Sequence, residues 1–193
     1  MKRLYLIGGP MGVGKTTVCR MLKRELPACV FLDGDWCWDM DPFQVTEETK
    51  KMVLENITFL LNQFLRCSAY ENIVFCWVMH QQDILDTILG NLEPGDWEAQ
   101  AFSLVCSPEE LMRRLLRDVE EGIRTADVIP RSLERLGCYA GLDTCRIDVT
   151  GLTPEEAARL VVQKHSRMGI DNKNAGLPRK EEKENHGKVQ GLH

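Results

Sequence analysis

The sequence predicts a single α/β domain in which a five-stranded parallel sheet is flanked by helices. Short apolar runs alternate along the chain with longer stretches of helical period, as they do where parallel strands are connected by helices. The chain has 193 residues, of which 44% are hydrophobic and 27% are charged. This length and composition are typical of one soluble domain and exclude a chain that is disordered over most of its length.

Five short runs are the expected strands, and they cover residues 4–7, 30–32, 73–79, 101–106 and 146–149. Every residue of the third run is apolar, which favours a strand buried on both faces in the middle of the sheet. Helices are expected over residues 15–26 and 84–92 and after three N-cap residues, Thr46, Ser107 and Thr153. Ser107 and Thr153 are each followed by proline and, three residues later, by glutamate, a pattern that opens helices.

We expect the folded domain to end at residue 168. Residues 169–193 are rich in charged and polar side chains and contain few apolar ones, so they predict a C-terminal tail without a core of its own.

The overall charge and the cysteines exclude several classes of protein. With 24 Lys+Arg against 29 Asp+Glu, the net charge is −5, which argues against a large basic surface for nucleic acid or for an anionic membrane. The longest apolar run has seven residues (73–79), far fewer than the ~20 that cross a bilayer, and the first apolar run is too short for a secretion signal. The eight cysteines have no zinc-ligand spacing and are interpreted as small buried side chains in a reducing cytoplasm.

Residues 9–16 (GPMGVGKT) fit the pattern GxxxxGK[ST] between an expected strand and an expected helix. Glycines let the backbone curl so that successive N–H groups face a phosphate, and the helix dipole adds positive potential. Lys15 is expected to reach the β- and γ-phosphates of ATP and the Thr16 hydroxyl to bind Mg²⁺. The expected nucleotide-binding residues in this segment are Gly9, Met11, Gly12, Val13, Gly14, Lys15, Thr16 and Thr17.

Two carboxylates, Asp33 and Asp35, follow the second expected strand at the sheet edge where open α/β folds place their ligands. One carboxylate could orient Mg²⁺ while the other accepts the proton of an attacking hydroxyl. The alternative is a turn in which aspartate bonds its own backbone.

Arginines cluster after the fourth expected strand. Arg113, Arg114 and Arg117 lie on the helix there, and Arg124 and Arg131 flank residues 120–130, which have little apolar content. Such a segment could be a mobile lid that brings arginines to the transferring phosphoryl group. The alternative is a solvated helix face whose arginines pair with Glu109, Glu110 and Asp118.

The aromatic stretch after Asp35 and a histidine after the third strand are further candidates. Trp36, Trp38, Met40, Pro42 and Phe43 could wall an acceptor pocket or could be core beneath a loop. His80 could contact substrate, although a lone histidine is more often structural.

These motifs together resemble the small P-loop kinases of the shikimate kinase, gluconate kinase, adenylylsulfate kinase and chloramphenicol phosphotransferase group. The resemblance covers residues 3–166 and depends on four segments, 9–16, 31–35, 107–117 and 147–154. It implies the three-layer P-loop NTPase fold with strand order 2-3-1-4-5. It also implies that Asp35 is the base, that Asp33 belongs to the magnesium shell, that Arg114 contacts the adenine side and that Arg117 or Arg124 is a lid arginine.

Two departures from this group bear on the site. The third strand ends without the aspartate of a Walker B motif, so metal binding falls to Thr16, the phosphates and Asp33. Residues 36–72, where the acceptor should bind, match none of these enzymes well enough to identify a substrate.

The resulting prediction is an ATP-dependent phosphotransferase that moves the γ-phosphoryl group of Mg-ATP to a hydroxyl of a small molecule. The alternatives are a nucleoside or nucleotide kinase and a non-catalytic ATP-binding switch. The folded part lacks the guanine-reading NKxD motif, which disfavours a GTPase, and the oligomeric state is not indicated.

Overall fold

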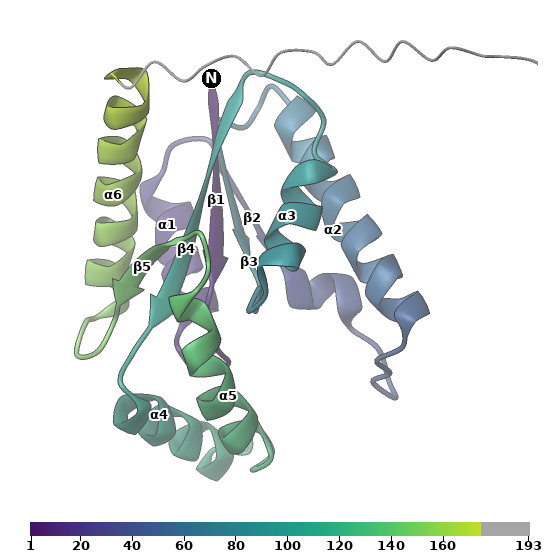
Figure 1. Cartoon of the computed structure of the whole chain (residues 1–193), viewed down its shortest axis with the longest axis vertical. Coiled ribbons are helices and arrows are strands. Elements are labelled where there is room, and N and C mark those ends of the chain that lie inside the picture. The colour runs from purple at the N-terminus through teal and green to yellow at the C-terminus, as the bar shows by residue number, and fades with distance from the viewer. Residues whose placement is uncertain (175–193) are drawn as a thin grey trace, which may run out of the picture.

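The computed structural model describes the backbone of residues 1–174 and the side chains of residues 1–166 (Figure 1). Its strands are β1 (Lys2–Gly8), β2 (Cys29–Asp33), β3 (Asn72–Cys76), β4 (Trp97–Val105) and β5 (Cys145–Asp148). Its α-helices are α1 (Lys15–Glu25), α2 (Glu47–Arg66), α3 (Gln82–Gly90), α4 (Pro108–Glu120), α5 (Val128–Leu136) and α6 (Pro154–Asn174). Two 3₁₀ helices, η1 (Gly34–Trp38) and η2 (Gly137–Ala140), complete the described elements.

The described strands form one five-stranded sheet with the order β2-β3-β1-β4-β5, and all four neighbouring pairs are parallel. Leu4 faces Ile73 of β3 on one side and Ala99 of β4 on the other. The predicted fold class and strand order are therefore confirmed. All carboxyl ends of the strands lie at the same edge of the sheet, which is the edge where α4 and α5 lie in Figure 1.

The helices cover both faces of the sheet. Tyr5 and Ile7 of β1 pack in the cluster that includes α1 and α6, whereas Leu4 and Leu6 pack in the cluster that includes α2 and α3. This alternation follows from the two-residue period of a strand. In Figure 1, α1 and α6 accordingly lie on one side of the sheet and α2 and α3 on the other.

The third strand is shorter than predicted, because β3 ends at Cys76 and residues 77–79 form a loop. The Val78 carbonyl accepts a 3.4 Å bond from Gly9 N and a 2.6 Å bond from Tyr139 Oη, so it supports the start of the phosphate loop. Met79 adopts a positive φ of 39°, which interrupts the extended backbone. The apolar character of residues 73–79 alone did not indicate that the strand ends at Cys76.

The segment between α4 and β5 also differs from prediction. Residues 121–127 form the connection there, and α5 begins at Val128, so the expected lid segment 120–130 ends within a helix. Pro130 is the third residue of α5, where proline is tolerated because the first turn has no intrahelical acceptor for its missing N–H. The 3₁₀ helices η1 and η2 were likewise not predicted.

At the C-terminus, α6 runs to Asn174, six residues beyond the predicted domain end at residue 168. The rest of the expected tail, residues 175–193, lies outside the described residues.

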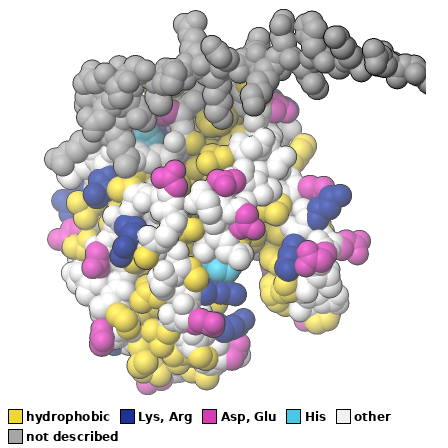
Figure 2. All heavy atoms as spheres, viewed as in Figure 1, with side chains coloured by type: hydrophobic (Ala, Val, Ile, Leu, Met, Phe, Trp, Pro, Cys, Tyr) yellow, Lys and Arg dark blue, Asp and Glu magenta, His cyan; other side chains and the backbone are white. Residues whose placement is uncertain are grey.

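The surface in Figure 2 carries Lys/Arg and Asp/Glu side chains interspersed, and apolar side chains gather over α4. Met112 and Leu116 of α4 are exposed there. None of the described helices is long and apolar enough to cross a membrane. The prediction that the cysteines are buried holds for Cys19, Cys76 and Cys106 and is wrong for Cys67 and Cys138, which are exposed.

Candidate active site

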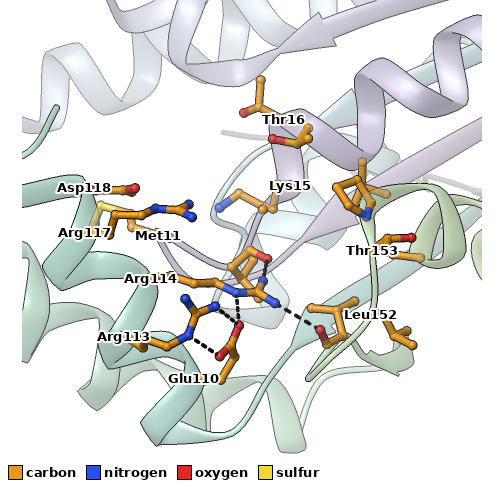
Figure 3. Close-up of a pocket in the computed structure, with 18 of the residues that line it drawn as sticks. Met11, Lys15, Thr16, Glu110, Arg113, Arg114, Arg117, Asp118, Leu152 and Thr153 are labelled. Carbon is orange, nitrogen blue, oxygen red and sulfur yellow. Dashed lines mark hydrogen bonds and ion pairs between the residues drawn. The ribbon is translucent and has the colours of Figure 1, made fainter. Parts of the chain in front are cut away.

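A cavity of about 650 Å³ opens at the carboxyl edge of the sheet. The phosphate loop and the start of α1 form one wall, α4 and residue 124 form another, and the β5–α6 connection forms a third (Figure 3). All of the predicted site residues except Gly9 line it: Met11, Gly12, Val13, Gly14, Lys15, Thr16, Thr17, Asp33, Asp35, Arg114, Arg117 and Arg124. The fold thus brings together side chains from four separate segments.

The glycines of the phosphate loop are required by the backbone. Gly9 has a φ of 150°, and a Cβ on it would lie 2.6 Å from the Leu104 carbonyl oxygen. Gly12 and Gly14 have φ values of 81° and 104°, and Gly14 is the N-cap residue of α1. Gly9 therefore shapes the loop against β4 without lining the cavity, and the loop has the curled backbone that presents N–H groups to an anion.

Lys15, the first residue of α1, folds back over the loop. Its Nζ donates 2.9 Å hydrogen bonds to the carbonyl oxygens of Gly9 and Pro10. Burial lowers the pKa of Lys15, while the nearby carboxylates of Asp35 and Asp33 oppose this shift. The ammonium group is thus held at the cavity by two acceptors that a phosphate could replace.

Thr16 and the two aspartates form a connected group. Thr16 Oγ1 donates a 2.8 Å hydrogen bond to Asp33 Oδ2, and Asp33 Oδ1 accepts a 3.2 Å bond from the backbone N–H of Asp35. Asp33 is buried, with 5% of its surface exposed, and is the N-cap of η1. Asp33 therefore makes the turn contact foreseen as an alternative, and the same turn projects Asp35 into the cavity.

The carboxyl group of Asp35 is shifted toward the protonated form. Partial burial raises its pKa, and the charge of Asp33 raises it further, whereas Lys15 and Arg124 lower it. A carboxylate of raised basicity inside a cavity suits the removal of a proton from a hydroxyl.

The oxygen atoms of Thr16 and Asp33 fit a magnesium ion. Mg²⁺ prefers oxygen ligands and is commonly held by one or two side chains together with phosphate oxygens and water. Among the described residues there is no group of three or more His, Cys, Asp or Glu that could hold a metal ion. Thr16 Oγ1 and Asp33 Oδ2 are the atoms that would hold the ion.

Two arginines reach the cavity from the connection between α4 and α5 and from the end of α4. Arg124 donates from Nε to Asp118 Oδ2 at 3.1 Å, and Arg117 is exposed, with its Nε 3.9 Å from Glu121 Oε1. Arg131 does not line the cavity and instead pairs with Asp127. Both arginines thus face a carboxylate, of Asp118 or of Glu121, and phosphate contact by Arg124 or Arg117 stays a prediction.

Nearer the start of α4, on the same wall, Arg113 and Arg114 converge on Glu110 (Figure 3). Arg114 also donates to the carbonyl oxygens of Val13 and Val149, at 2.7 and 3.1 Å. The expected pairing of α4 arginines with α4 carboxylates is therefore present, and Glu110, Arg113 and Arg114 also line the cavity.

The other sequence candidates do not line the cavity. The His80 Nδ1 atom is buried without a hydrogen-bond partner among the described residues, and burial lowers the pKa of this histidine. Trp36 and Phe43 are 59% and 62% exposed, whereas Trp38 packs 5.2 Å from Phe43 and 6.3 Å from Trp77 between ring centroids. The aromatic stretch is therefore partly surface and partly packed beneath it.

Sequence reasoning did not place Glu110 and Asp118 in the site. Segment 147–154, on which the resemblance depends, does reach the cavity, and the lining residues from β5 onward are Val149, Gly151, Leu152 and Thr153 together with Pro154 and Ala157 of α6. Glu110 and Asp118 had been considered only as surface partners of arginines. Spacing of i, i+4 between Glu110 and Arg114 signals the ion pair but not the cavity that it faces.

The family model described as "AAA domain" matches residues 6–133 of this chain. A comparison with curated protein sequences finds no significant match.

Solved structures share the fold at low sequence identity. The tunicamycin resistance protein of Deinococcus radiodurans is 18% identical over 86% of this chain and 96% of that one, with a TM-score of 0.63. A gluconokinase from Sinorhizobium meliloti 1021 is 17% identical over 90% and 97%, with a TM-score of 0.66. The shikimate kinase of Aquifex aeolicus is 18% identical over 87% and 98%, with a TM-score of 0.58. The resemblance to the small P-loop kinases is thereby confirmed for the fold.

Proposed function

The chain belongs to the AAA domain family, and from this premise we propose that it transfers the γ-phosphoryl group of Mg-ATP to a hydroxyl of a small molecule. The similar folds include a gluconokinase and a shikimate kinase, whose names indicate hydroxyl acceptors. Their low identity leaves the acceptor of this chain open.

The observation that carries the proposal is the position of Asp35 in the same cavity as Lys15 and Thr16. A nucleotide-dependent switch needs a phosphate loop and a metal ligand but has no acceptor to deprotonate. A second carboxylate beside the metal-ligand candidate, with its pKa raised by burial and by Asp33, favours chemistry on a hydroxyl.

The roles divide among the residues as follows. The phosphate-loop N–H groups and Lys15 bind the phosphates, and Thr16 with Asp33 would hold Mg²⁺, which when bound neutralises charge on the phosphates. Asp35 orients the acceptor hydroxyl and takes its proton as the oxygen attacks phosphorus. Arg124 or Arg117 stabilises the charge on the transferring group after leaving its present carboxylate partner.

The acceptor can be sought with an ATP-consumption screen over nucleosides, sugars, sugar acids and antibiotics of the aminoglycoside and phenicol classes. This screen includes the nucleoside kinase alternative. ATP binding without consumption across all of these classes would favour the switch.

With an acceptor in hand, Asp35→Asn tests the base. We expect kcat to fall about 10²- to 10⁴-fold, the usual cost of losing a general base, while Mg-ATP affinity stays within a factor of about two. Asp33→Asn is the matched control, because it removes a carboxylate from the same turn. It should weaken Mg-ATP binding or raise the magnesium requirement. If both variants weaken Mg-ATP equally and neither slows phosphoryl transfer at saturating nucleotide, the pair is a metal site and Asp35 is not the base.

A further inference from the structure

A tryptophan beside the proposed base has no role in the chemistry described above. Trp77 directly follows β3, and its backbone N–H donates a 3.2 Å hydrogen bond to the Ile7 carbonyl of β1. Cys76, the residue before it, pairs in the sheet with Asp33, the last residue of β2. The sheet therefore fixes the backbone of Trp77 next to the point where the chain leaves β2 toward Asp35.

The side chain of Trp77 packs on the backbone of η1. A Cβ on Gly34 would lie 2.6 Å from Trp77 Cγ and 2.8 Å from Cδ1, so the indole ring occupies the space beside Gly34. The ring is half-buried and also packs against Trp38, with ring centroids 6.3 Å apart. These contacts restrict the rotation of the indole ring.

The residue after Gly34 is Asp35, and the indole group of Trp77 interacts with its carboxylate. Burial and the charge of Asp33 raise the pKa of Asp35, while Lys15 and a hydrogen bond from the Trp77 side chain oppose that shift. Indole has one polar group, the Nε1–H, which only donates. The Nε1–H is therefore the donor to Asp35, and a carboxylate that accepts one such bond keeps its second oxygen atom for another partner.

We propose that Trp77 is a positioning residue for Asp35, whose indole N–H holds one carboxylate oxygen so that the other faces the acceptor hydroxyl. The inference rests on the proposed function, in which Asp35 is the base. Lys15 and Arg124 also attract the Asp35 carboxylate, but they act through charge and not through a hydrogen bond. Attraction between charges fixes no direction, whereas a hydrogen bond prefers a narrow range of angles, so the orientation of the carboxylate depends on Trp77.

Nuclear magnetic resonance of the ¹⁵N-labelled protein tests the contact without an acceptor. Each of the four tryptophans has one indole N–H signal, and replacing them by phenylalanine in turn assigns the signals, by elimination if one variant does not fold. We expect Asp35→Ala to move the Trp77 signal upfield and to speed its exchange with deuterium. The Trp97 N–H, which donates to the Glu93 carbonyl at 2.9 Å, should keep its signal unchanged. A Trp77 signal that does not respond to Asp35→Ala would overturn the inference.

With an acceptor in hand, Trp77→Phe keeps an aromatic ring on Gly34 and removes the N–H. We expect kcat to fall about tenfold, because a misplaced reacting group loses part of its effect, while Mg-ATP affinity stays within a factor of about two. Trp97→Phe makes the same change in the first residue of β4 and should leave kcat unaltered. Unchanged kcat in Trp77→Phe would overturn the inference. An equal loss of Mg-ATP affinity would also overturn it, since the role of Trp77 would then be structural.

A double-mutant cycle shows whether Trp77 acts through Asp35. Adding Trp77→Phe to Asp35→Ala should lower the residual kcat no further, because no carboxylate is left to orient. A further tenfold loss would mean that Trp77 acts by another route and would overturn the inference.

Failure of the proposed function looks different from failure of the contact. In the first case the unaltered protein phosphorylates no acceptor, while the Trp77 signal still responds to Asp35→Ala. That result would leave the contact in place and overturn its role toward an acceptor.

Discussion

Lys15 is the residue that we propose binds the phosphates, and we expect the fold not to depend on it. Its ammonium group is satisfied by the Gly9 and Pro10 carbonyls at 2.9 Å, and burial lowers its pKa, so the protein holds a charge there against a desolvation cost. Alanine is tolerated at a helix start. We expect Lys15→Ala to reduce kcat about 10²-fold or more, the usual cost of removing one preorganised charge, while circular dichroism and the melting temperature stay unchanged. Lys23→Ala, on the exposed side of the same helix, should leave turnover intact, and full turnover in Lys15→Ala would remove the phosphate role of this residue.

The positions of such residues could be predicted because local structure determines them. Lys15 and Thr16 are placed by the loop and the helix start that contain them, and Asp33 by the strand that it ends. The contacts of Arg114 could not be predicted, because Val13 and Val149 lie 101 and 35 residues away in the sequence. Only the folded sheet brings the three segments together.

At the scale of elements, the 3₁₀ helix η1 connects the sheet to the proposed base. A Cβ on Gly34, its first residue, would lie 2.6 Å from Trp77 Cγ, so the aromatic ring fills the space where a larger residue would go. We expect Gly34→Ala to lower the free energy of unfolding by about 1–3 kcal/mol, as overpacking does, measured by denaturant titration. It should also lower kcat, because Asp35 follows directly.

The matched control for Gly34 is Gly90→Ala at the end of α3, where a new Cβ meets no described atom within 4 Å. It should leave the free energy of unfolding unchanged or raise it by up to about 1 kcal/mol. Equal effects of the two substitutions would show that Trp77 does not restrict Gly34.

The helices whose first turn carries a capping residue were predicted most closely. Thr46 and Ser107 cap α2 and α4 through bonds to Thr49 N and Glu110 N, as their residue types indicate. The helix α5 was missed, because residues 120–130 have little apolar content and were interpreted as a lid segment, whereas α5 begins at Val128. The end of β3 was missed because Val78, which lies in the loop after the strand, is as apolar as the strand itself. Its carbonyl oxygen accepts hydrogen bonds from Gly9 and Tyr139, which are distant in sequence.

For the whole molecule, the alternation of strands and helices predicted the parallel sheet, and the resemblance to the small P-loop kinases predicted the strand order. Neither observation predicted how α6 packs on the sheet. His165 of α6 is 4% exposed and lies against Tyr5 of β1 and Phe102 of β4, with ring centroids 4.3 and 6.5 Å away. Its Nε2 atom is buried without a partner among the described residues. A histidine at this point joins the last helix to the centre of the sheet and makes their packing sensitive to acid.

The direction of this sensitivity follows from the charges around His165. Burial lowers its pKa, Arg3 of β1 lowers it further, and Glu98 of β4 partly opposes them. The folded state therefore keeps the ring neutral at a pH where the unfolded chain, with a histidine pKa of about 6.5, takes up a proton. Proton uptake by the unfolded state alone means that the free energy of unfolding falls as the pH drops below about 6.5, by at most about 1.4 kcal/mol per pH unit for one group.

His165→Phe should remove this contribution while keeping a ring between Tyr5 and Phe102. At pH 7.5 we expect the free energies of unfolding of the two proteins to agree within about 1.5 kcal/mol, as for a swap of similar volume. As the pH is lowered to 5, the unaltered protein should lose more stability than the variant, so the difference between them should shift steadily in favour of phenylalanine. Urea titrations at half-unit pH steps measure it, and the other titrating groups cancel in the comparison because both proteins contain them. Parallel curves from pH 7.5 to 5 would show that His165 takes up its proton equally in the folded and unfolded states, and that the acid sensitivity of this packing lies elsewhere.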